Sequence, residues 1–437
     1  MIYQNKMEID KINIALAGFG NIGSYFYKIL DKNKKNIFDK TGKIPFIKYI
    51  SARNINKKRN IKIPRIKWVK NPLELAKKND VDIIVELIGG ADGIAKKLIF
   101  LALKNKKHVI TANKALMSKH GDELSTIAEK NNVNLEYEAS VAGGVPIIKS
   151  IKEGLIANKI NKIYGILNGT TNYILSTMES KKKSFYEILN KAKKLGFAET
   201  NPVSDLNGSD SAAKLRILSS LSFNKSISKN KILTEGIENI NLTDILYAKN
   251  LGYKIKLLSI SEIKKNKLME RVHPCLILEN SYIAKIDGVL NAIVVDGLPI
   301  GKSVLQGEGA GPGPTSSALI SDLCTILKGE INFPFGVPSK LRKSISKLNI
   351  LNHQCSSYLR IEVKDQPGVL SSITKSFAKN KISIKNLIQK PNKKNKKASI
   401  IIITHENSEK NYNNLFRNLS KNKFIIKKPT FIRIENV

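Results

Sequence analysis

Three acids and one lysine lie close together in one short segment of the chain. Glu199 and Asp205 come first, and Asp210 precedes Lys214 by four residues. If the chain is helical from residue 208 onward, Asp210 and Lys214 lie on one helix face, where they can share a small polar substrate. A lysine in such a place can both give and take a proton. The segment therefore predicts acid–base chemistry on a small charged molecule.

The same spacing also has a simpler interpretation. Asp210 would cap a helix N-terminus and form an exposed pair with Lys214, one turn later, without any chemical role. The residues themselves leave both interpretations open.

A glycine-rich turn near the start of the chain predicts a nucleotide site. The apolar run 12–17 enters this turn, and apolar residues then recur at helical spacing. In such a strand, turn and helix, the glycines permit the tight turn, the approach of a pyrophosphate and close packing. The predicted cofactor contacts are Gly18, Phe19, Gly20, Asn21, Ile22 and Gly23. Further strands are expected over 46–50, 82–87 and 108–111, separated by helices, which makes this region a Rossmann domain.

The end of the second strand favours NADP over NAD. It carries Arg53 rather than an acid that would hold a free ribose hydroxyl, so a 2′-phosphate is the expected partner. Lys57, Lys58 and Arg59 would add positive charge. NAD stays possible.

Two other strand ends lie at the same predicted edge of the sheet. Residues 86–90 close the third strand, and residues 111–114 close the fourth, with Lys114 last. Ligands of open α/β sheets bind at this edge, so Lys114 is placed to reach the nicotinamide and the substrate. The alternative is that Lys114 only begins a helix over 115–130.

Composition excludes several classes of function. The 437 residues carry a net charge of +38, but of 74 basic residues only nine are Arg, so the lysines are interpreted as surface filler and nucleic acid is not an expected partner. The three cysteines and five histidines show no ligand spacing, so neither disulfides nor a catalytic zinc is expected. Without an apolar run long enough to span a bilayer, the chain is expected to be cytoplasmic.

Four motifs give the chain a resemblance to a known family. They are Thr-Ala-Asn-Lys ending at Lys114, the segment 137–146, Gly-Ile-Leu-Asn-Gly-Thr-Thr-Asn-Tyr ending at Tyr173, and the segment 196–215 that contains the acids. In order and spacing they resemble homoserine dehydrogenase over nearly the whole chain. One departure is that Glu308 and Pro312 lie in an expected loop where less charge and another glycine would be usual.

The resemblance implies a role for each matching residue. Lys214 would exchange the proton of the substrate, with Lys114 beside it and Asp205 orienting it. Glu199 and Asp210, together with Lys114, would bind homoserine. Gly196 and Gly309 would contact the cofactor. A monovalent cation, sodium above all, would be held by backbone carbonyls of Glu138, Val141, Gly143 and Val145.

The end of the chain resembles an ACT domain. Strands expected over 357–363, 381–389, 398–404 and 424–434, with helices starting near 369 and 407, form a βαββαβ ferredoxin-like unit. Such domains bind amino acids, and the effector implied here is threonine. The alternative is a module that only assembles the oligomer.

Together these observations predict an α/β protein with three domains. They are a Rossmann domain over 1–140, onto which a helix over 315–330 packs, an α+β catalytic and dimerisation domain over 141–331, and an ACT domain over 356–437 after a connector over 332–355. The expected activity is the NAD(P)-dependent interconversion of L-homoserine and L-aspartate 4-semialdehyde in threonine, methionine and isoleucine biosynthesis, by a dimer or tetramer. The alternatives are another Rossmann oxidoreductase and a non-catalytic nucleotide or amino-acid sensor.

Overall fold

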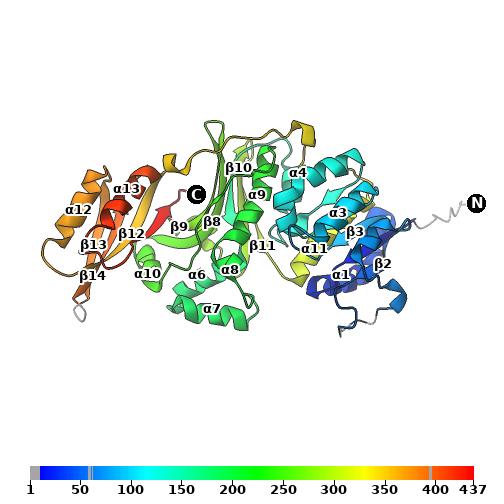
Figure 1. Ribbon diagram of the computed structural model, residues 1–437, viewed down its shortest axis with the longest axis horizontal. Coiled ribbons are helices and arrows are strands. Elements are labelled where there is room, and N and C mark those ends of the chain that lie inside the picture. The colour runs from blue at the N-terminus through cyan, green and yellow to red at the C-terminus, as the bar shows by residue number, and fades with distance from the viewer. Residues whose placement is uncertain (1–9, 58–60, 62, 393–395) are drawn as a thin grey trace, which may run out of the picture. The chain divides into compact units, whose positions relative to one another are not determined.

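The protein is known from a computed structural model that describes residues 10–437 apart from 58–60, 62 and 393–395. The chain forms two compact units, and its elements are labelled in Figure 1. The first unit comprises the chain up to Ile163, Ala213–Asn230 and Asn291–Ile345, and the second comprises Tyr164–Ala212, Lys231–Leu290 and Ser346–Val437. Each unit is therefore assembled from segments that are far apart in the sequence.

The first unit contains a parallel five-stranded sheet with the strand order β2-β1-β3-β4-β5. Its strands are β1 (Asp10–Ala17), β2 (Lys43–Ser51), β3 (Ile83–Glu86), β4 (His108–Thr111) and β5 (Leu135–Glu136). Its main helices are α1 (Asn21–Lys32), α2 (Lys34–Thr41), α3 (Ile94–Lys104), α4 (Lys114–Lys130), α5 (Ile147–Lys149) and α11 (Pro312–Leu327). The alternation of strands and helices confirms the Rossmann-like fold class.

Helix α11 returns to the nucleotide-binding sheet from late in the sequence. Leu319 and Leu323 of α11 share one buried core with Phe26 and Leu30 of α1 and with the strands of the sheet. The helix begins at Pro312, which therefore does not lie in the expected loop. Proline suits the first turn of a helix, because it lacks the N–H that would have no intrahelical partner there. Strands β11 (Gly301–Glu308), β10 (Leu290–Leu298) and β6 (Lys159–Ile166) lie side by side in this order.

The second unit is built on mainly antiparallel strands, with parallel pairings of β16 and β7 to β9, and on helices. Its sheet contains β8 (Tyr253–Lys264), β9 (Lys267–Leu278), β16 (Thr430–Ile434), β12 (Gln354–Lys364), β14 (Lys397–Thr404) and β13 (Ile384–Asn392), in this spatial order. Short strands β7 (Leu233–Thr234) and β15 (Asn407–Ser408) pair with β9 and β12. Its helices are α6 (Gly169–Lys181), α7 (Phe185–Lys194), α8 (Val203–Leu206), α10 (Leu242–Asn250), α12 (Val369–Lys379) and α13 (Glu409–Leu419), while α9 (Ser209–Phe223) continues into the first unit.

The C-terminal part of the second unit is the expected ACT fold. Its chain order is β12, α12, β13, β14, α13, β16, with a core that includes Leu359, Ile361 and Phe377. Helix α13 was expected from residue 407, but it starts at Glu409 because the side chain of Ser408 caps it by accepting the N–H of Asn411. Within the described ranges, none of the helices is long and apolar enough to cross a membrane.

Candidate active site

The glycine turn of the first unit has the geometry that nucleotide binding requires. Gly18 has φ +105°, and a Cβ there would lie 2.5 Å from the carbonyl oxygen of Leu87. A Cβ on Gly23 would lie 2.3 Å from the carbonyl oxygen of Gly18, whereas one on Gly20 would meet no protein atom within 4 Å. Gly20 is also the N-cap of α1, which has no side-chain cap. The turn therefore leaves open space and backbone donors at a helix N-terminus, where a pyrophosphate fits.

The neighbouring residues of the turn have different surroundings. The ring of Phe19 is buried and packs edge-on against Tyr27 and Trp68, so a contact of Phe19 with a cofactor would come from its backbone. Arg53 is exposed two residues beyond Ser51, whose carbonyl accepts the N–H of Gly18 at 2.9 Å. Arg53 thus follows the end of β2, the strand whose last residue bonds to the glycine turn. Lys58 and Arg59 lie outside the described residues.

Lys114 is held by a network at the ends of β3 and β4. The buried carboxylate of Glu86 accepts the N–H groups of Ile88 (2.6 Å) and Gly89 (2.9 Å), and its other oxygen accepts the hydroxyl of Thr111 at 2.6 Å. Asn113 caps α4 and also donates to the carbonyl of Gly90 at 2.7 Å. Lys114 is the first, half-buried residue of α4. Its position at the carboxyl edge of the sheet is therefore fixed from both strands.

The loop predicted to hold sodium packs against the residue predicted to touch the cofactor. A Cβ on Gly143 would lie 2.8 Å from the carbonyl oxygen of Gly309, and the N–H of Gly144 donates to the carbonyl of Glu308 at 2.9 Å. Val141, Gly143 and Val145 are buried. The structure therefore brings the two predicted features together.

Buried acids lie beside this loop. The carboxylate of Glu138 accepts the N–H groups of Ile148 (2.9 Å) and Lys149 (2.7 Å), and burial raises its pKa to about 7. Asp322 accepts the N–H of Glu138 at 3.0 Å, and burial together with neighbouring acids raises the pKa of Asp322 as well. Lys152 pairs with a further acid, Glu136, at 2.8 Å. The loop thus lies beside carboxyl groups that burial tends to keep protonated, and beside one ion pair.

In the second unit, one asparagine joins two of the predicted acids. The amide nitrogen of Asn168 donates to Oδ1 of Asp205 at 2.8 Å and to Oδ2 of Asp210 at 3.0 Å. The amide oxygen of Asn168 accepts the N–H of Thr171 and so caps α6. Asp205 lies on the short helix α8. Asn168 therefore donates both of its amide hydrogens to carboxylates. Because Asn168 is the cap residue of α6, the start of this helix fixes the positions of the two acids relative to each other.

Helix α9 carries Asp210 in its first turn and Lys214 one turn later. Both side chains are buried, with 8% and 9% of their surface exposed. The alternative that Asp210 and Lys214 form an exposed pair on the helix surface is therefore wrong. Ser209, the first residue of α9, follows Gly208, whose φ of +83° lets the chain turn into the helix.

Glu199 and Gly196 lie on the exposed segment after α7. The hydroxyl of Thr170, in the first turn of α6, donates to the carbonyl of Phe197 at 2.6 Å, and the ring of Phe197 packs on Tyr173. The same helix terminus that positions Asp205 and Asp210 thereby also holds the segment of Glu199.

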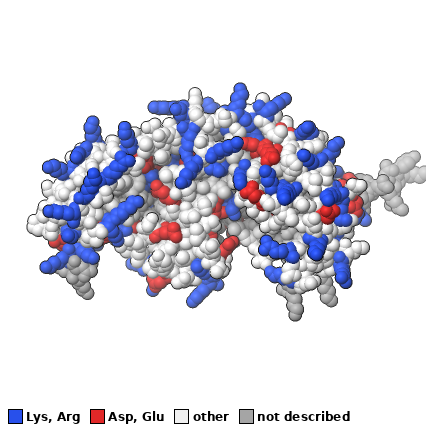
Figure 2. Space-filling view, viewed as in Figure 1, with Lys and Arg blue, Asp and Glu red and all other residues white. Residues whose placement is uncertain are grey.

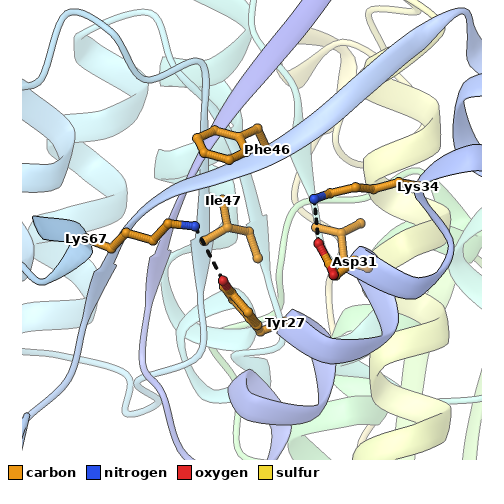
Figure 3. A pocket seen from close by; sticks show the side chains of 7 residues that line it. Tyr27, Asp31, Lys34, Phe46, Ile47 and Lys67 are labelled. Atoms are coloured by element: carbon orange, nitrogen blue, oxygen red, sulfur yellow. Dashed lines mark hydrogen bonds and ion pairs between the residues drawn. The ribbon is translucent and has the colours of Figure 1, made fainter. Parts of the chain in front are cut away.

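A pocket elsewhere in the first unit contains none of the predicted site residues. Figure 3 shows it between α1, α2 and β2, with Lys67 3.4 Å from the hydroxyl of Tyr27 and Asp31 paired with Lys34. Lys67 also lies 4.8 Å from the ring centre of Phe46, as a cation–π contact. These partners satisfy one another, and the pocket offers no group with an evident chemical task.

Lysines are spread over the surface. On the face shown in Figure 2, the basic side chains are scattered among acids and uncharged residues and do not gather in one stripe. This pattern is typical of a solvated surface.

Asn168 and Glu86 lie in segments that the sequence singled out, but their roles as positioning residues were not predicted. Asn168 precedes Gly-Thr-Thr, a typical helix start, so its role as a cap was open to prediction. Its bonds to two acids about 40 residues later were not, because they depend on the tertiary fold.

Comparisons with known proteins agree along the chain. Residues 146–324 match the family model described as homoserine dehydrogenase, residues 18–138 match that of the homoserine dehydrogenase NAD-binding domain, and residues 357–423 match the ACT domain. Homoserine dehydrogenase of Helicobacter pylori is 40% identical, and that of Neisseria gonorrhoeae is 38% identical, each over 98% of this chain and 99% of its own length.

Solved structures give the same result. The crystal structure of a homoserine dehydrogenase from Thiobacillus denitrificans is 35% identical, with a TM-score of 0.90 over 98% of this chain and 99% of its own. A hyperthermophilic archaeal homoserine dehydrogenase in complex with NADPH is 23% identical and shows the fold alone, with a TM-score of 0.61 over 74% of this chain and 99% of its own. The agreement of sequence, domain content and fold shows that this chain belongs to the homoserine dehydrogenase family of oxidoreductases, in the form that carries an ACT domain.

Proposed function

We propose that the chain interconverts L-homoserine and L-aspartate 4-semialdehyde, with Lys214 as the general acid and base, in the biosynthesis of threonine, methionine and isoleucine. The observation that carries this proposal is the pairing of Asp205 and Asp210 by Asn168, one turn before the buried Lys214. A bound nicotinamide would take or supply the hydride. Lys214 would take the hydroxyl proton during oxidation and return it to the carbonyl oxygen during reduction.

The acids suit the other end of the substrate. Homoserine carries an ammonium group, for which Asp210 and the exposed Glu199 are the natural partners, and a carboxylate, for which Lys114 is available. Asp205, held by Asn168, would orient Lys214.

A substitution of Lys214 tests the assignment. Lys214→Ala is expected to lower kcat with homoserine by at least about 100-fold, the usual effect of losing a general acid–base group. Its affinity for NADPH, measured by fluorescence, should stay close to that of the wild type. Lys191→Ala, an exposed lysine of α7, serves as the matched control. Unchanged turnover in Lys214→Ala would refute the assignment.

We propose NADP as the preferred cofactor, with NAD as a weaker alternative. The support is that Arg53 follows the end of β2, next to the glycine turn, where a 2′-phosphate would lie. Gly18–Gly23, the open space at Gly20, and Gly196 and Gly309 would hold the rest of the molecule. Arg53→Ala should weaken NADPH binding by about tenfold and leave NADH binding unchanged. An equal loss for both cofactors would contradict a 2′-phosphate contact.

A sodium ion is proposed at the backbone carbonyls of Glu138, Val141, Gly143 and Val145. Oxygen ligands suit a hard cation, and the buried carboxyl groups of Glu138 and Asp322 lie beside this loop, where a cation would favour their charged forms. The melting temperature should rise when sodium replaces choline at constant ionic strength. Equal melting temperatures in the two salts would exclude the site.

The ACT domain is proposed to confer feedback inhibition by threonine, within a dimer or tetramer in the cytoplasm. The support for this proposal is the βαββαβ fold of residues 356–437. We propose that the Rossmann domain spans 1–140, that the catalytic domain spans 141–331, and that 332–355 connect it to the ACT domain. Strand β13 ends the sheet of the second unit and could pair with another copy. Inhibition by threonine, with light scattering to give the oligomeric state, tests both parts. Threonine without effect would leave assembly as the role of the domain.

A further inference from the structure

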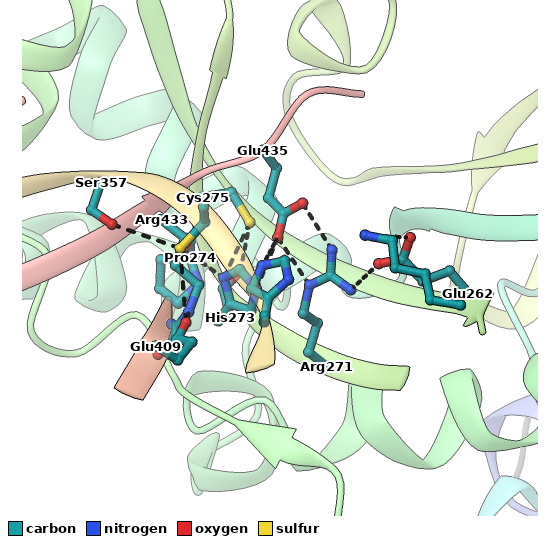
Figure 4. A network of polar contacts seen from close by, with 12 residues as sticks. Glu262, Arg271, His273, Pro274, Cys275, Ser357, Glu409, Arg433 and Glu435 are labelled. Carbon is teal, nitrogen blue, oxygen red and sulfur yellow. Dashed lines mark hydrogen bonds and ion pairs between the residues drawn. The ribbon is translucent and has the colours of Figure 1, made fainter. Parts of the chain in front are cut away.

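A second cluster of chemically active side chains lies in the second unit, apart from the acids described above. His273 and Cys275 are two residues apart on β9, so they face the same side of that strand. Glu435 follows β16, and its N–H donates to the carbonyl of Leu276 at 3.0 Å. All three side chains are buried, and their potential ligand atoms lie within 4.8 Å of one another (Figure 4).

A fourth residue, His353, points into the same cluster. Nε2 of His353 lies 3.6 Å, and Nε2 of His273 lies 3.5 Å, from Oε1 of Glu435. Both distances exceed those of ordinary hydrogen bonds, which are about 2.7–3.2 Å. They are close to the separation of about 3.4 Å expected between two ligands of one tetrahedral ion with bonds of about 2.1 Å.

The imidazole rings of His273 and His353 contain buried nitrogen atoms that make no hydrogen bond within the described part of the chain. Among the described residues, neither ring nitrogen of His353 nor Nε2 of His273 has a hydrogen-bond partner, although His353 is 4% exposed and His273 is fully buried. Buried polar atoms of this kind are uncommon, and here the two Nε2 atoms have only their long contacts with Glu435 in place of the water they have lost. A shared ion would satisfy them.

The charges around the cluster also leave room for a cation. Two neighbouring sets of ion pairs together contain three cations and four carboxylates, namely Arg271 and Lys264 with Glu262 and Glu435, and Arg433 with Glu409 and Glu235. One negative charge is therefore in excess. A divalent ion carries two positive charges, and the thiolate that it binds carries one negative charge, so together they add one positive charge. This charge balances the excess carboxylate of the two sets of ion pairs.

We infer that His273, Cys275, His353 and Glu435 form a binding site for Zn²⁺. Two imidazoles, a thiolate and a carboxylate suit zinc, whereas magnesium and calcium prefer oxygen ligands. Nδ1 of His273 lies 3.3 Å from the sulfur of Cys275 and 3.0 Å from the carbonyl oxygen of Pro274, which leaves Nε2 of this ring to bind the ion. On binding, the sulfur forms a bond to zinc as its S–H bond breaks, and the proton leaves to solvent.

The surroundings supply the outer support that zinc sites require. Arg271 donates from Nε to Oε1 of Glu435 and from Nη2 to Oε2, both at 2.9 Å, and so orients that carboxylate. The four ligands come from β9, from the segment before β12 and from the residue after β16. Zinc would therefore fasten the ACT strands to β9, as a structural ion with no part in hydride transfer.

The test measures metal directly in the full-length chain without a histidine tag. After exposure to zinc and gel filtration, elemental analysis should find about one zinc per chain. Cys275→Ser and His353→Asn should each weaken zinc binding by at least about tenfold. Cys324→Ser, a half-buried cysteine in the first unit, should keep the metal.

Cobalt substitution identifies the ligands and covers the case of an unstable variant. Co²⁺ in the wild-type protein should give the ligand-field bands of a tetrahedral site and a thiolate charge-transfer band, and Cys275→Ser should lose only the latter. Less than about a tenth of a zinc per chain after reconstitution would overturn the inference. So would equal zinc contents in the wild type and in folded His353→Asn, because the metal would then be adventitious.

Discussion

Replacing Asn168 by Asp separates its two roles in the site. Asp caps a helix as well as Asn does, so the N–H of Thr171 keeps its acceptor and α6 should persist. The new side chain cannot donate, however, and it places a third carboxylate next to Asp205 and Asp210. The substitution therefore attacks the arrangement of the acids while it spares the helix.

The size of the effect follows from the two lost hydrogen bonds. A hydrogen bond to a charged acceptor contributes about 1.5–3 kcal/mol, and the two are not additive. A loss of about 3 kcal/mol from the transition state lowers kcat/KM by roughly 100-fold. We therefore expect this fall in kcat/KM for homoserine, with the dissociation constant of NADPH within about twofold of the wild type. The defect should narrow at lower pH, because the introduced carboxyl group can donate a hydrogen bond again once it is protonated.

Steady-state kinetics with homoserine as the varied substrate, NADPH fluorescence and circular dichroism give these quantities. Asn71→Asp is the matched control, because Asn71 caps another short helix through the N–H of Leu73. The reasoning is refuted if Asn168→Asp keeps kcat/KM within about threefold of the wild type, or if the control loses as much.

Two further perturbations test the fold around the site. Gly23→Ala places a Cβ 2.3 Å from the backbone oxygen of Gly18 and should lower the melting temperature of the free protein. Gly20→Ala meets open space, so it should leave the melting temperature unchanged and weaken only NADPH binding. Equal melting temperatures for the two variants would contradict this reasoning. Burial raises the pKa of Asp287, but its ion pair with Lys256 lowers it overall, so the pair stabilises the fold above the unfolded pKa of about 4 and loses that stabilisation as the pH falls through the folded value. Burial also lowers the pKa of Lys256, so the desolvation of its ammonium group offsets part of this gain. Lys256 also donates to Oδ1 of Asn172 and to the carbonyl of Ile286, and neither of these acceptors titrates. Lys256→Met should therefore cost on the order of 3 kcal/mol in urea unfolding at neutral pH, and only the ion-pair part of this difference should be lost below about pH 4; a difference independent of pH would count against the argument.

The nucleotide-binding sheet was predictable because its signals are local. The apolar strands, the glycine turn and the helix that follows lie within one short segment, and each glycine has a steric reason that a sequence can reveal. The order of elements in the ACT part was predictable for the same reason. The start of α13 was missed by two residues because the capping role of Ser408 was not recognised.

Contacts between distant segments were not predictable from a single sequence. His353 lies about 80 residues, and Glu435 about 160 residues, beyond His273, so the histidines show no ligand spacing although they lie together in the fold. The burial of Asp210 and Lys214 likewise depends on packing that periodicity cannot report. Chemistry-bearing residues could be named from the motifs, but their partners could not.

The parallel pairing of β16 with β9 joins Arg433 to Cys275, roughly 160 residues apart in the sequence. Pairings over such distances form late in folding, because the entropy of closing a long loop must be offset before the contact contributes. The parallel sheet of the first unit pairs strands that are much closer in sequence, such as β1 with β2. During refolding, the pairing of β1 with β2 should therefore form before the sheet of the second unit is complete.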